Sequence, residues 1–263
     1  MTKAKMKLYG IPQLIEADVD PKGNIVNLNG QRFQTNELSV DVPISGTVYG
    51  TLLNYKGAFA ALNEAMTKSP YHEPPKAPIL YIKPVNTFSS CNMPIPLPSH
   101  TQALEIGAAL GVVIGQKATR VSEEQALSYA AGYTVVNDVS IPHDSVYRPA
   151  VQYKARDGFC PIGPWIIDRS AVSNPDELGI RVYINNELKQ ENTTANLIRP
   201  VARLIADVTD FMTLHPGDVL LVGVPEKAPS AAAGDIVRIE IDCVGMLENT
   251  VVREQELVLG VAK

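Results

Sequence analysis

The residues best suited to chemistry stand in one short stretch, QYKARDGFCPIGPW, at residues 152–165. Lys154, Arg156 and Asp157 are grouped there, ahead of a loop rich in Gly and Pro. On an open surface such a cluster is a set of solvated ion pairs that adds little to stability. In a compact apolar loop the same charges need partners or a ligand. We therefore expect a functional role, with Lys154 and Arg156 on one face if the chain is extended, and Trp165 serving packing.

A second candidate group is the carboxylate of Asp138, in the stretch VVNDVS. It follows an apolar segment, residues 133–136, that is typical of a buried strand. A carboxylate at a strand end can bind a metal or act as a base. Asp at such a position is also a frequent turn former that bonds its own backbone, so this alternative stays open.

A third candidate group is the stretch IPHDSVYRP, which supplies His143, Asp144, Tyr147 and Arg148. His143 beside Asp144 suggests a general base with an orienting carboxylate. Neighbours on an extended chain point to opposite faces, however, which favours solvated loop residues. Arg148 is the better candidate, because a guanidinium can grip a substrate carboxylate with two hydrogen bonds.

The elements that must position these groups are mostly strands. Residues 235–243, DIVRIEIDC, alternate with period two and place Cys243 on the apolar face. Residues 181–189 have the pattern of a hairpin with its turn at two asparagines. Strands do not alternate evenly with helices as a doubly wound sheet requires. The sequence therefore predicts a β-rich α+β fold.

Three helices are expected. Ser122 and Gln125 have capping-box spacing and open a helix that Gly132 can end. A second helix, over residues 200–212, has an apolar stripe and is stopped by HPG. A third follows Tyr55. The domain organisation predicted from composition is a small β-rich appendage over residues 1–45 and a main domain over residues 46–263.

Length and composition restrict the class of function. The chain has 263 residues, a formal net charge of −5 and 45% hydrophobic residues, enough for a sizeable core. The acidic balance and the lack of Lys/Arg runs argue against nucleic acid or an anionic membrane as partner. There is no signal peptide pattern and no apolar run near the ~20 residues of a membrane span. Three cysteines without metal-ligand spacing suit a reducing compartment, so we expect a cytoplasmic protein with a small-molecule partner.

Several stretches together resemble the fumarylacetoacetate hydrolase family. They are LNYKGAF, SPYHEPPKAPILYIKP, YTVVND, YRP, K-x-R-DG-F-C-PIGPW, LIADVTDFMTLHPGDVLLVG and VGMLENTVV, in one order over residues 46–257. The likeness is strongest to the isomerase/decarboxylase branch of 4-hydroxyphenylacetate catabolism, and to the amino-terminal half or subunit within that branch. The resemblance implies mixed β-sheets rolled around a central pocket, in dimers or higher oligomers.

The resemblance also implies a site. Members hold Mg²⁺ or Mn²⁺ with a Glu-x-Glu pair and an Asp, the cation chelates the keto or hydroxy carboxylate end of the substrate, and a lysine stabilises the enolate. Asp138 matches the third metal ligand and Lys154 the lysine. Tyr147 and Arg148 fall in the segment near the substrate, and Asp157 is a further neighbour of Lys154.

This sequence departs from the family pattern at the metal. The strand LEIGAALGVVIG carries Gly107 and Ala109 where the two glutamates are expected. One aspartate offers too few oxygen ligands for a hard divalent cation. Glu105 shares the strand face but lies about 6.6 Å from the first ligand position, so we do not expect it to compensate.

Other departures point the same way. The His and Glu that the resemblance implies for the lid correspond to Ala58 and Ala61, and the Gly-Thr-Pro turn that it implies has Val224 in place of its hydroxyl residue.

Two hypotheses follow. In the first, the chain is an enzyme that ketonises 2-hydroxyhepta-2,4-diene-1,7-dioate, or decarboxylates 5-oxopent-3-ene-1,2,5-tricarboxylate. Lys154 would stabilise the enolate, Arg148 would grip a carboxylate, and Asp138 or His143 would move the proton. In the second, the chain is a non-catalytic or assisting subunit that pairs with a metal-bearing homologue, and Lys154 and Asp138 remain as a buried ion pair. The first predicts turnover by the isolated chain, the second only by a mixed complex.

Overall fold

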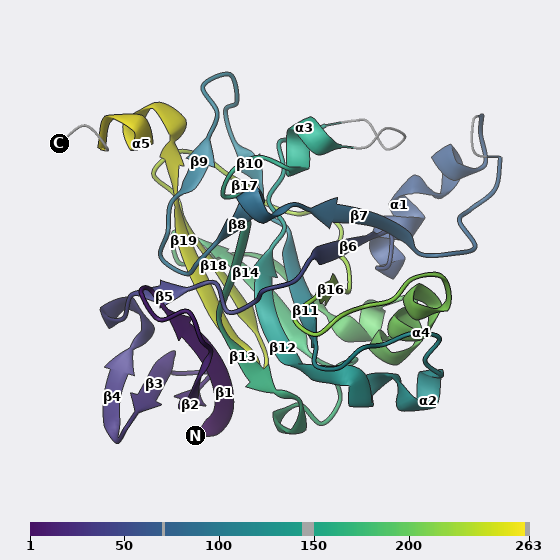
Figure 1. The fold of residues 1–263 in the computed structure, drawn as a ribbon. Coiled ribbons are helices and arrows are strands. Elements are labelled where there is room, and N and C mark those ends of the chain that lie inside the picture. Colours follow the sequence, from purple (N-terminus) through teal and green to yellow (C-terminus); the bar gives the residue numbers. More distant parts are fainter. Residues whose placement is uncertain (70–71, 144–149, 261–263) are drawn as a thin grey trace.

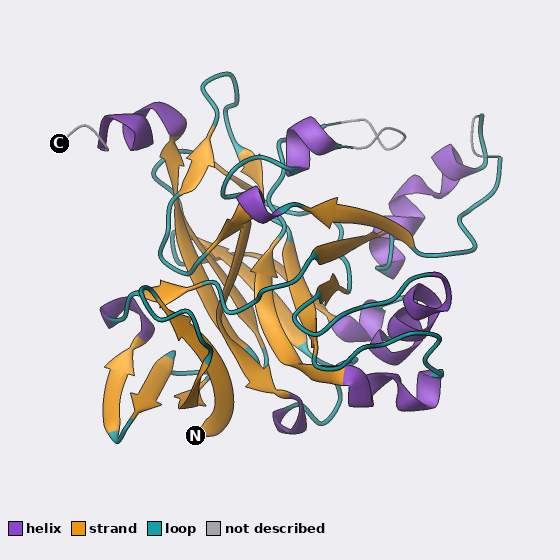
Figure 2. Ribbon diagram, in the orientation of Figure 1, coloured by secondary structure: helices purple, strands orange, loops and turns teal. Residues whose placement is uncertain are grey.

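A computed structural model describes residues 1–69, 72–143 and 150–260 of the chain. Strands dominate the described part, and the few helices lie at its periphery (Figures 1 and 2). The strands are β1 Thr2–Leu8, β2 Ile15–Asp20, β3 Ile25–Leu28, β4 Gln31–Gln34, β5 Val40–Asp41, β6 Val48–Leu52, β7 Ile79–Lys83, β8 Phe88–Ser89, β9 Ile95–Leu97, β10 Leu104–Glu105, β11 Ala108–Ile114, β12 Ala130–Asn137, β13 Cys160–Asp168, β14 Gly179–Ile184, β15 Glu187–Thr193, β16 Val219–Leu221, β17 Ser230–Ala231, β18 Ile236–Ile241 and β19 Gly245–Arg253. The α-helices are α1 Lys56–Met66, α2 Glu123–Ala126, α3 Val151–Lys154, α4 Val201–Phe211 and α5 Glu254–Gly260. Short 3₁₀ turns are η1 Thr35–Glu37, η2 Val85–Thr87, η3 Leu127–Tyr129, η4 Arg169–Ala171 and η5 Thr194–Asn196.

The largest sheet is rolled. Its strand order is β4-β3-β2-β1-β13-β12-β11-β16-β6-β7, and β8 also pairs with β13. Only Pro84 and η2 separate β7 from β8, so the chain that leaves the β7 edge returns at once to the middle of the sheet. This return brings the last residue of β7 close to the C-terminal end of β12 and to the beginning of β13. The β-rich α+β fold with sheets rolled around a pocket, predicted from the sequence, is confirmed.

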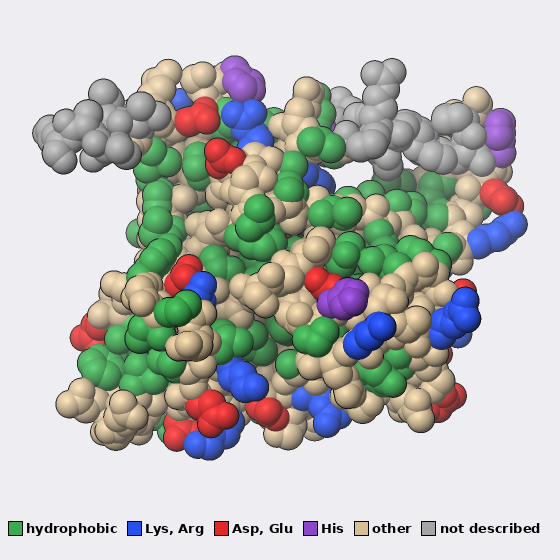
Figure 3. All heavy atoms as spheres, in the orientation of Figure 1, with side chains coloured by type: hydrophobic (Ala, Val, Ile, Leu, Met, Phe, Trp, Pro, Cys, Tyr) green, Lys and Arg blue, Asp and Glu red, His purple; other side chains and the backbone are tan. Residues whose placement is uncertain are grey.

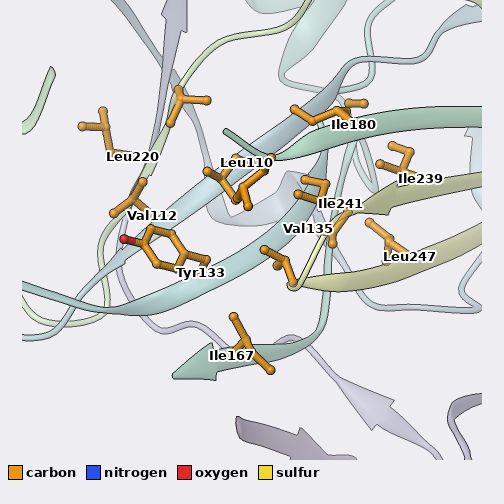
Figure 4. Close-up of a cluster of buried hydrophobic side chains, with 14 of the residues drawn as sticks. Leu110, Val112, Tyr133, Val135, Ile167, Ile180, Leu220, Ile239, Ile241 and Leu247 are labelled. Carbon is orange, nitrogen blue, oxygen red and sulfur yellow. The ribbon is translucent and has the colours of Figure 1, made fainter. Parts of the chain in front are cut away.

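The core lies between this sheet and a second sheet of order β15-β14-β18-β19-β9. Figure 4 shows side chains of the two sheets facing one another, with Leu110, Tyr133 and Val135 from the large sheet. Ile239 and Leu247 approach them from the smaller sheet. All five are at most 1% exposed, so the strands that carry the site rest on a fixed apolar support.

Several predicted elements are confirmed. Helix α4 occupies the predicted 200–212 segment and buries Leu204, Ile205 and Val208, and α1 follows Tyr55. The hairpin turn at residues 185–186 joins β14 to β15, with both asparagines at the positive φ that a tight hairpin turn needs.

Three expectations about local structure are wrong. The helix that begins after Ser122 ends in a 3₁₀ turn, and Gly132 lies in β12, because pairing with β11 overrides the local helix signal. Cys243 is exposed and follows β18 rather than continuing its apolar face. Lys154 ends helix α3, so it does not share an extended face with Arg156. The proposed boundary at residue 45 stays a prediction; β1, which precedes it, pairs with β13.

The surface in Figure 3 mixes Lys and Arg side chains with Asp and Glu side chains, and neither sign forms a continuous patch on the face shown. Among the described residues, no helix combines the length and apolarity needed to cross a bilayer.

Candidate functional site

A cavity of about 240 Å³ opens where β7, β10, β12 and α3 meet. In Figure 1, β7, β10 and α3 lie near one another in the upper part of the view, and α1 lies to the right of β7. The residues that line the cavity are Thr51, Leu52, Leu53, Ala58, Tyr81, Glu105, Gly107, Asp138, Ser140, Lys154, Val224, Pro225, Glu226, Lys227 and Ala228. Asp138 and Lys154 therefore both line the cavity; they are the residues that match the metal-binding aspartate and the lysine implied by the family resemblance.

Asp138 directly follows β12, and the antiparallel ladder of β11 and β12 fixes its backbone. The last ladder pair is Ala108 with Asn137, and beyond it the Asp138 amide donates to the Gly107 carbonyl at 2.7 Å. Asp138 thus continues the strand and does not form the turn that was the alternative reading. Its side chain is fully buried.

Two lysines neutralise this buried carboxylate. The Lys83 ammonium lies 2.9 Å from Oδ1 of Asp138, and the Lys154 ammonium lies 3.0 Å from Oδ2. Lys83 also donates to the carbonyls of Val139, at 3.0 Å, and Lys154, at 2.7 Å. Lys83 thus makes two hydrogen bonds and one ion pair, and its side chain is fully buried.

Tyr81 completes the cluster. Its hydroxyl donates to Oδ2 of Asp138, and the Lys154 ammonium lies 5.0 Å from the centre of its ring. The ring lies across Gly50 on the neighbouring strand β6, where a side chain would collide with it. Burial, and then the negative charge of Asp138, raise the pKa of Tyr81 well above its usual value, so Tyr81 stays a hydrogen-bond donor.

The cluster of Tyr81, Lys83, Asp138 and Lys154 carries two positive charges and one negative charge. Lys83 is sealed from solvent, whereas the Lys154 side chain is 17% exposed and lines the cavity. The excess positive charge therefore faces the cavity through Lys154. Such a site favours an anionic ligand or a developing oxyanion.

The ionisation of Asp138 should make stability depend on pH. Burial alone raises the pKa of Asp138, but the charges of Lys154 and Lys83 and the Tyr81 hydrogen bond outweigh it and bring the pKa well below its usual value. A depressed folded-state pKa adds stability above the unfolded value, about 3.9, that is lost as pH falls below it. We expect the free energy of unfolding to fall by up to about 1.4 kcal/mol per pH unit more in the wild type than in Asp138→Asn below about pH 4. Urea titrations between pH 3 and 6 measure this slope, and equal slopes in the two proteins would contradict the assignment.

The other predicted residues lie differently. His143 stacks on Tyr153, with ring centres 4.7 Å apart, and is not among the described residues that line the cavity. The exposed Asp157 accepts a hydrogen bond from Asn86 at 2.7 Å and also lies off the cavity wall. Tyr147 and Arg148, the predicted substrate contacts, fall outside the described residues, so their roles stay predictions.

Sequence reasoning missed Lys83 and Tyr81. Both lie on β7, and Tyr81 is 57 residues from Asp138 along the chain. The signal was a single lysine at the end of the apolar strand ILYIK, immediately before Pro84. A charged residue that is buried needs a partner, which would have justified a search for a carboxylate.

The residues present do not fit the divalent cation that the family resemblance implies. Gly107 offers no side chain, and a Cβ built there would lie 2.4 Å from the Asp138 carbonyl oxygen. Ala109 is buried in an apolar cluster with Val136 and Ile162. Both carboxylate oxygens of Asp138 already face ammonium groups. Within the described part of the chain, no three His, Cys, Asp or Glu side chains come together as a ligand set.

At two positions where the resemblance implies a polar side chain, this chain has an apolar residue that lines the cavity. Ala58 of α1 and Val224 both line it. The cavity lining therefore combines the ammonium of Lys154 with apolar side chains at positions 58 and 224.

Comparisons with known proteins agree with the fold. A family model described as the fumarylacetoacetate (FAA) hydrolase C-terminal domain matches residues 47–252. The 4-hydroxyphenylacetate degradation bifunctional isomerase/decarboxylase of Escherichia coli is 42% identical over 214 residues, which cover 81% of this chain and 49% of that protein. The chain thus spans about half the length of the curated relatives it matches.

Solved structures share the fold over nearly the whole chain. The 2-hydroxyhepta-2,4-diene-1,7-dioate isomerase from Mycobacterium marinum is 26% identical, with a TM-score of 0.77 and coverage of 97% of this chain and 99% of that one. A maleylpyruvate hydrolase from Sphingobium sp. SYK-6, solved with manganese(II) and pyruvate, is 22% identical, with a TM-score of 0.75 and coverage of 95% and 99%. The chain belongs to the fumarylacetoacetate hydrolase family.

Proposed function

We propose that this chain ketonises a 2-hydroxy-2,4-dienedioate such as 2-hydroxyhepta-2,4-diene-1,7-dioate. The observation that carries the proposal is the partly exposed ammonium of Lys154, fixed at 3.0 Å from the buried Asp138 and facing a cavity of about 240 Å³. A seven-carbon diacid is small enough for a cavity of this class. The structural neighbour from Mycobacterium marinum is named as an isomerase of this diacid, and the E. coli relative as a bifunctional isomerase/decarboxylase of 4-hydroxyphenylacetate degradation, which supports the proposal.

In the proposed reaction, the enol oxygen at C2 becomes a carbonyl oxygen through an enolate in which negative charge builds up on that oxygen. Lys154 is the group that stabilises this charge, because its ammonium is already held at the cavity wall and needs no reorganisation. The C1 carboxylate of the substrate is drawn to the same excess positive charge.

Asp138 acts in this proposal as a positioning residue. Lys83 and Lys154 occupy its two oxygens, which leaves it a poor proton acceptor and a good anchor for Lys154. Tyr81 restricts the other side of Lys154 through its ring. We therefore do not assign the proton transfer to Asp138.

The proposal requires no divalent cation, since the residues at positions 107 and 109 offer no ligand oxygens. We expect the purified chain to ketonise the dienol at a rate that changes by less than about twofold when EDTA or Mg²⁺ is added. Loss of the diene absorbance measures the rate. Activity that EDTA abolishes and Mg²⁺ restores would contradict the metal-free site, and no activity in any condition would contradict the function.

The second candidate is an assisting subunit. The observation that favours it is that the chain spans only about half of the E. coli relative, leaving room for a homologous second unit. Adding a metal-bearing homologue to the assay tests this: turnover that appears only in the mixture favours the assisting role. Size-exclusion chromatography with light scattering distinguishes the homo-oligomer that we propose for the first function from the hetero-oligomer that the second requires.

A further inference from the structure

Ketonisation needs a group that moves a proton, and the cluster around Asp138 does not supply one. The ammonium of Lys154 has no lone pair to accept the enol proton. Asp138 is held ionised between two lysines. Among the described residues that line the cavity, the remaining carboxylates are Glu105 and Glu226.

Glu105 is turned toward the cavity by the strand that carries it. Leu104 and Ile106, its two neighbours, are 0% exposed and belong to the core. Side chains alternate along a strand, so Glu105 and Gly107 face the opposite way, and both line the cavity. Glu105 is thus a carboxylate on the cavity wall with a core anchor on each side.

Ser140 holds the Glu105 carboxylate. The Ser140 hydroxyl donates to Oε2 of Glu105 at 3.2 Å, and the two backbones exchange hydrogen bonds at 2.8 and 3.2 Å. On its other side Glu105 pairs with Ser230 of β17. A side chain on a backbone paired from both sides is well placed for a defined geometry.

Glu105 also lies one step along the wall from the charged cluster. The backbone of Glu105 pairs with the backbone of Ser140, and the backbone of Gly107 pairs with that of Asp138. Glu105 and Gly107 are two residues apart, which is about 6.6 Å along an extended chain. Gly107 places no side chain between them, and the close Asp138 carbonyl leaves no room for one. A dienol bound across this bare stretch can contact Lys154 through its C2 oxygen, while Glu105 lies beside both the C2 hydroxyl and the carbon chain.

Glu226 also lines the cavity, but its carboxylate lies against helix α1. Its carboxylate packs against the backbone of Gly57 at the start of α1, where a built Cβ would lie 2.1 Å from its carboxyl carbon. Asn192 donates to Oε1 at 3.4 Å, and Oε2 is buried with no hydrogen-bond partner among the described residues. Glu226 therefore serves here as the comparison for Glu105.

We propose that Glu105 is the catalytic proton carrier of this site, with Ser140 as its positioning residue; the inference rests on the proposed ketonisation. The Glu105 carboxylate takes the proton from the C2 hydroxyl, and C2=O forms as the O–H bond breaks. As C2=O forms, the C2=C3 double bond shifts to C3=C4, and the C4=C5 electrons take the proton that the carboxyl returns, which forms a C–H bond at C5. Glu105 ends as the carboxylate it began as, so no other reactant is needed.

The test compares Glu105→Gln with Glu226→Gln in the ketonisation assay, run in D₂O with the product examined by NMR. We expect Glu105→Gln to lower kcat by about 10²- to 10⁴-fold with a small change in KM, as for loss of a general acid–base group. Each product molecule gains one deuterium at C5. In the wild-type product this deuterium should occupy only one of the two stereochemical positions at C5, whereas in the residual product of Glu105→Gln it should be distributed over both positions. Ser140→Ala should lower kcat about tenfold, the loss expected for one orienting hydrogen bond.

Each result decides between readings. If the wild type and Lys154→Met are both inactive, the proposed function fails, and the inference about Glu105 fails with it. If the wild type is active and Glu105→Gln stays within about threefold of it, only the role of Glu105 is overturned. A larger loss in Glu226→Gln than in Glu105→Gln overturns it too. Glu105→Asp, which keeps the charge, guards against misfolding: it should retain more activity than Glu105→Gln at the same melting temperature.

Discussion

Replacing Lys154 with Met is expected to lower kcat/KM for ketonisation by about 10²- to 10³-fold, the loss measured when one donor to a developing oxyanion is removed. The reason is geometric. Lys154 is the ammonium of the cluster that reaches the cavity, whereas Lys83 is 0% exposed and cannot touch a substrate. Asp138 keeps Lys83 and Tyr81 as partners in this variant, so the fold should persist. Stopped-flow or steady-state loss of diene absorbance measures the effect.

The matched control is Lys189→Met, which removes a lysine from a surface pair with Glu187. We expect this variant to keep wild-type kinetics, because its charge lies on the exposed hairpin strand β15. Lys154→Met with wild-type activity would remove the main support of the proposed function. Lys154→Arg is informative as well, since a guanidinium keeps the charge but not the compact shape of the ammonium.

The largest effect on stability is expected from Asp138→Asn. This change leaves the buried Lys83 ammonium without its counter-charge, and breaking a buried pair by removing one partner costs about 3–5 kcal/mol. Equilibrium unfolding in urea, with circular dichroism as the readout, gives the free energy of unfolding. We expect Lys83→Met to be destabilising for the converse reason, although Asp138 retains Lys154.

The double variant Lys83→Met/Asp138→Asn measures the energetic coupling between the two charges. With both charges gone, its loss of stability should be smaller than the sum of the two single losses, because neither group is left as an uncompensated buried charge. The surface pair of Lys3 and Asp18, with side chains 73% and 42% exposed, provides the control. Asp18→Asn should change the free energy of unfolding by no more than about 1 kcal/mol. Additive losses at the buried pair would show that Lys83 and Asp138 are not energetically coupled.

The sequence by itself determined the features that depend on neighbours along the chain. The apolar stripe of α4 and the Asn-Asn hairpin between β14 and β15 follow from local periodicity and turn chemistry, and both are present. The series of stretches shared with one family identified the fold and marked Lys154 and Asp138, which meet at 3.0 Å. The glycine and alanine at residues 107 and 109 were also readable, because a residue type is a property of the sequence alone.

Only the tertiary structure decided how that site is completed. Rolling of the large sheet brings Lys83 and Tyr81 from β7 against Asp138, and no local pattern encodes a pairing between strands so far apart in the chain. The same holds for Glu105, whose partner Ser140 lies 35 residues away. Strand pairing also overrode the local helix signal around Gly132. Local interactions select the elements, but burial of a charge is settled by long-range packing, and here that packing surrounds one carboxylate with two lysines.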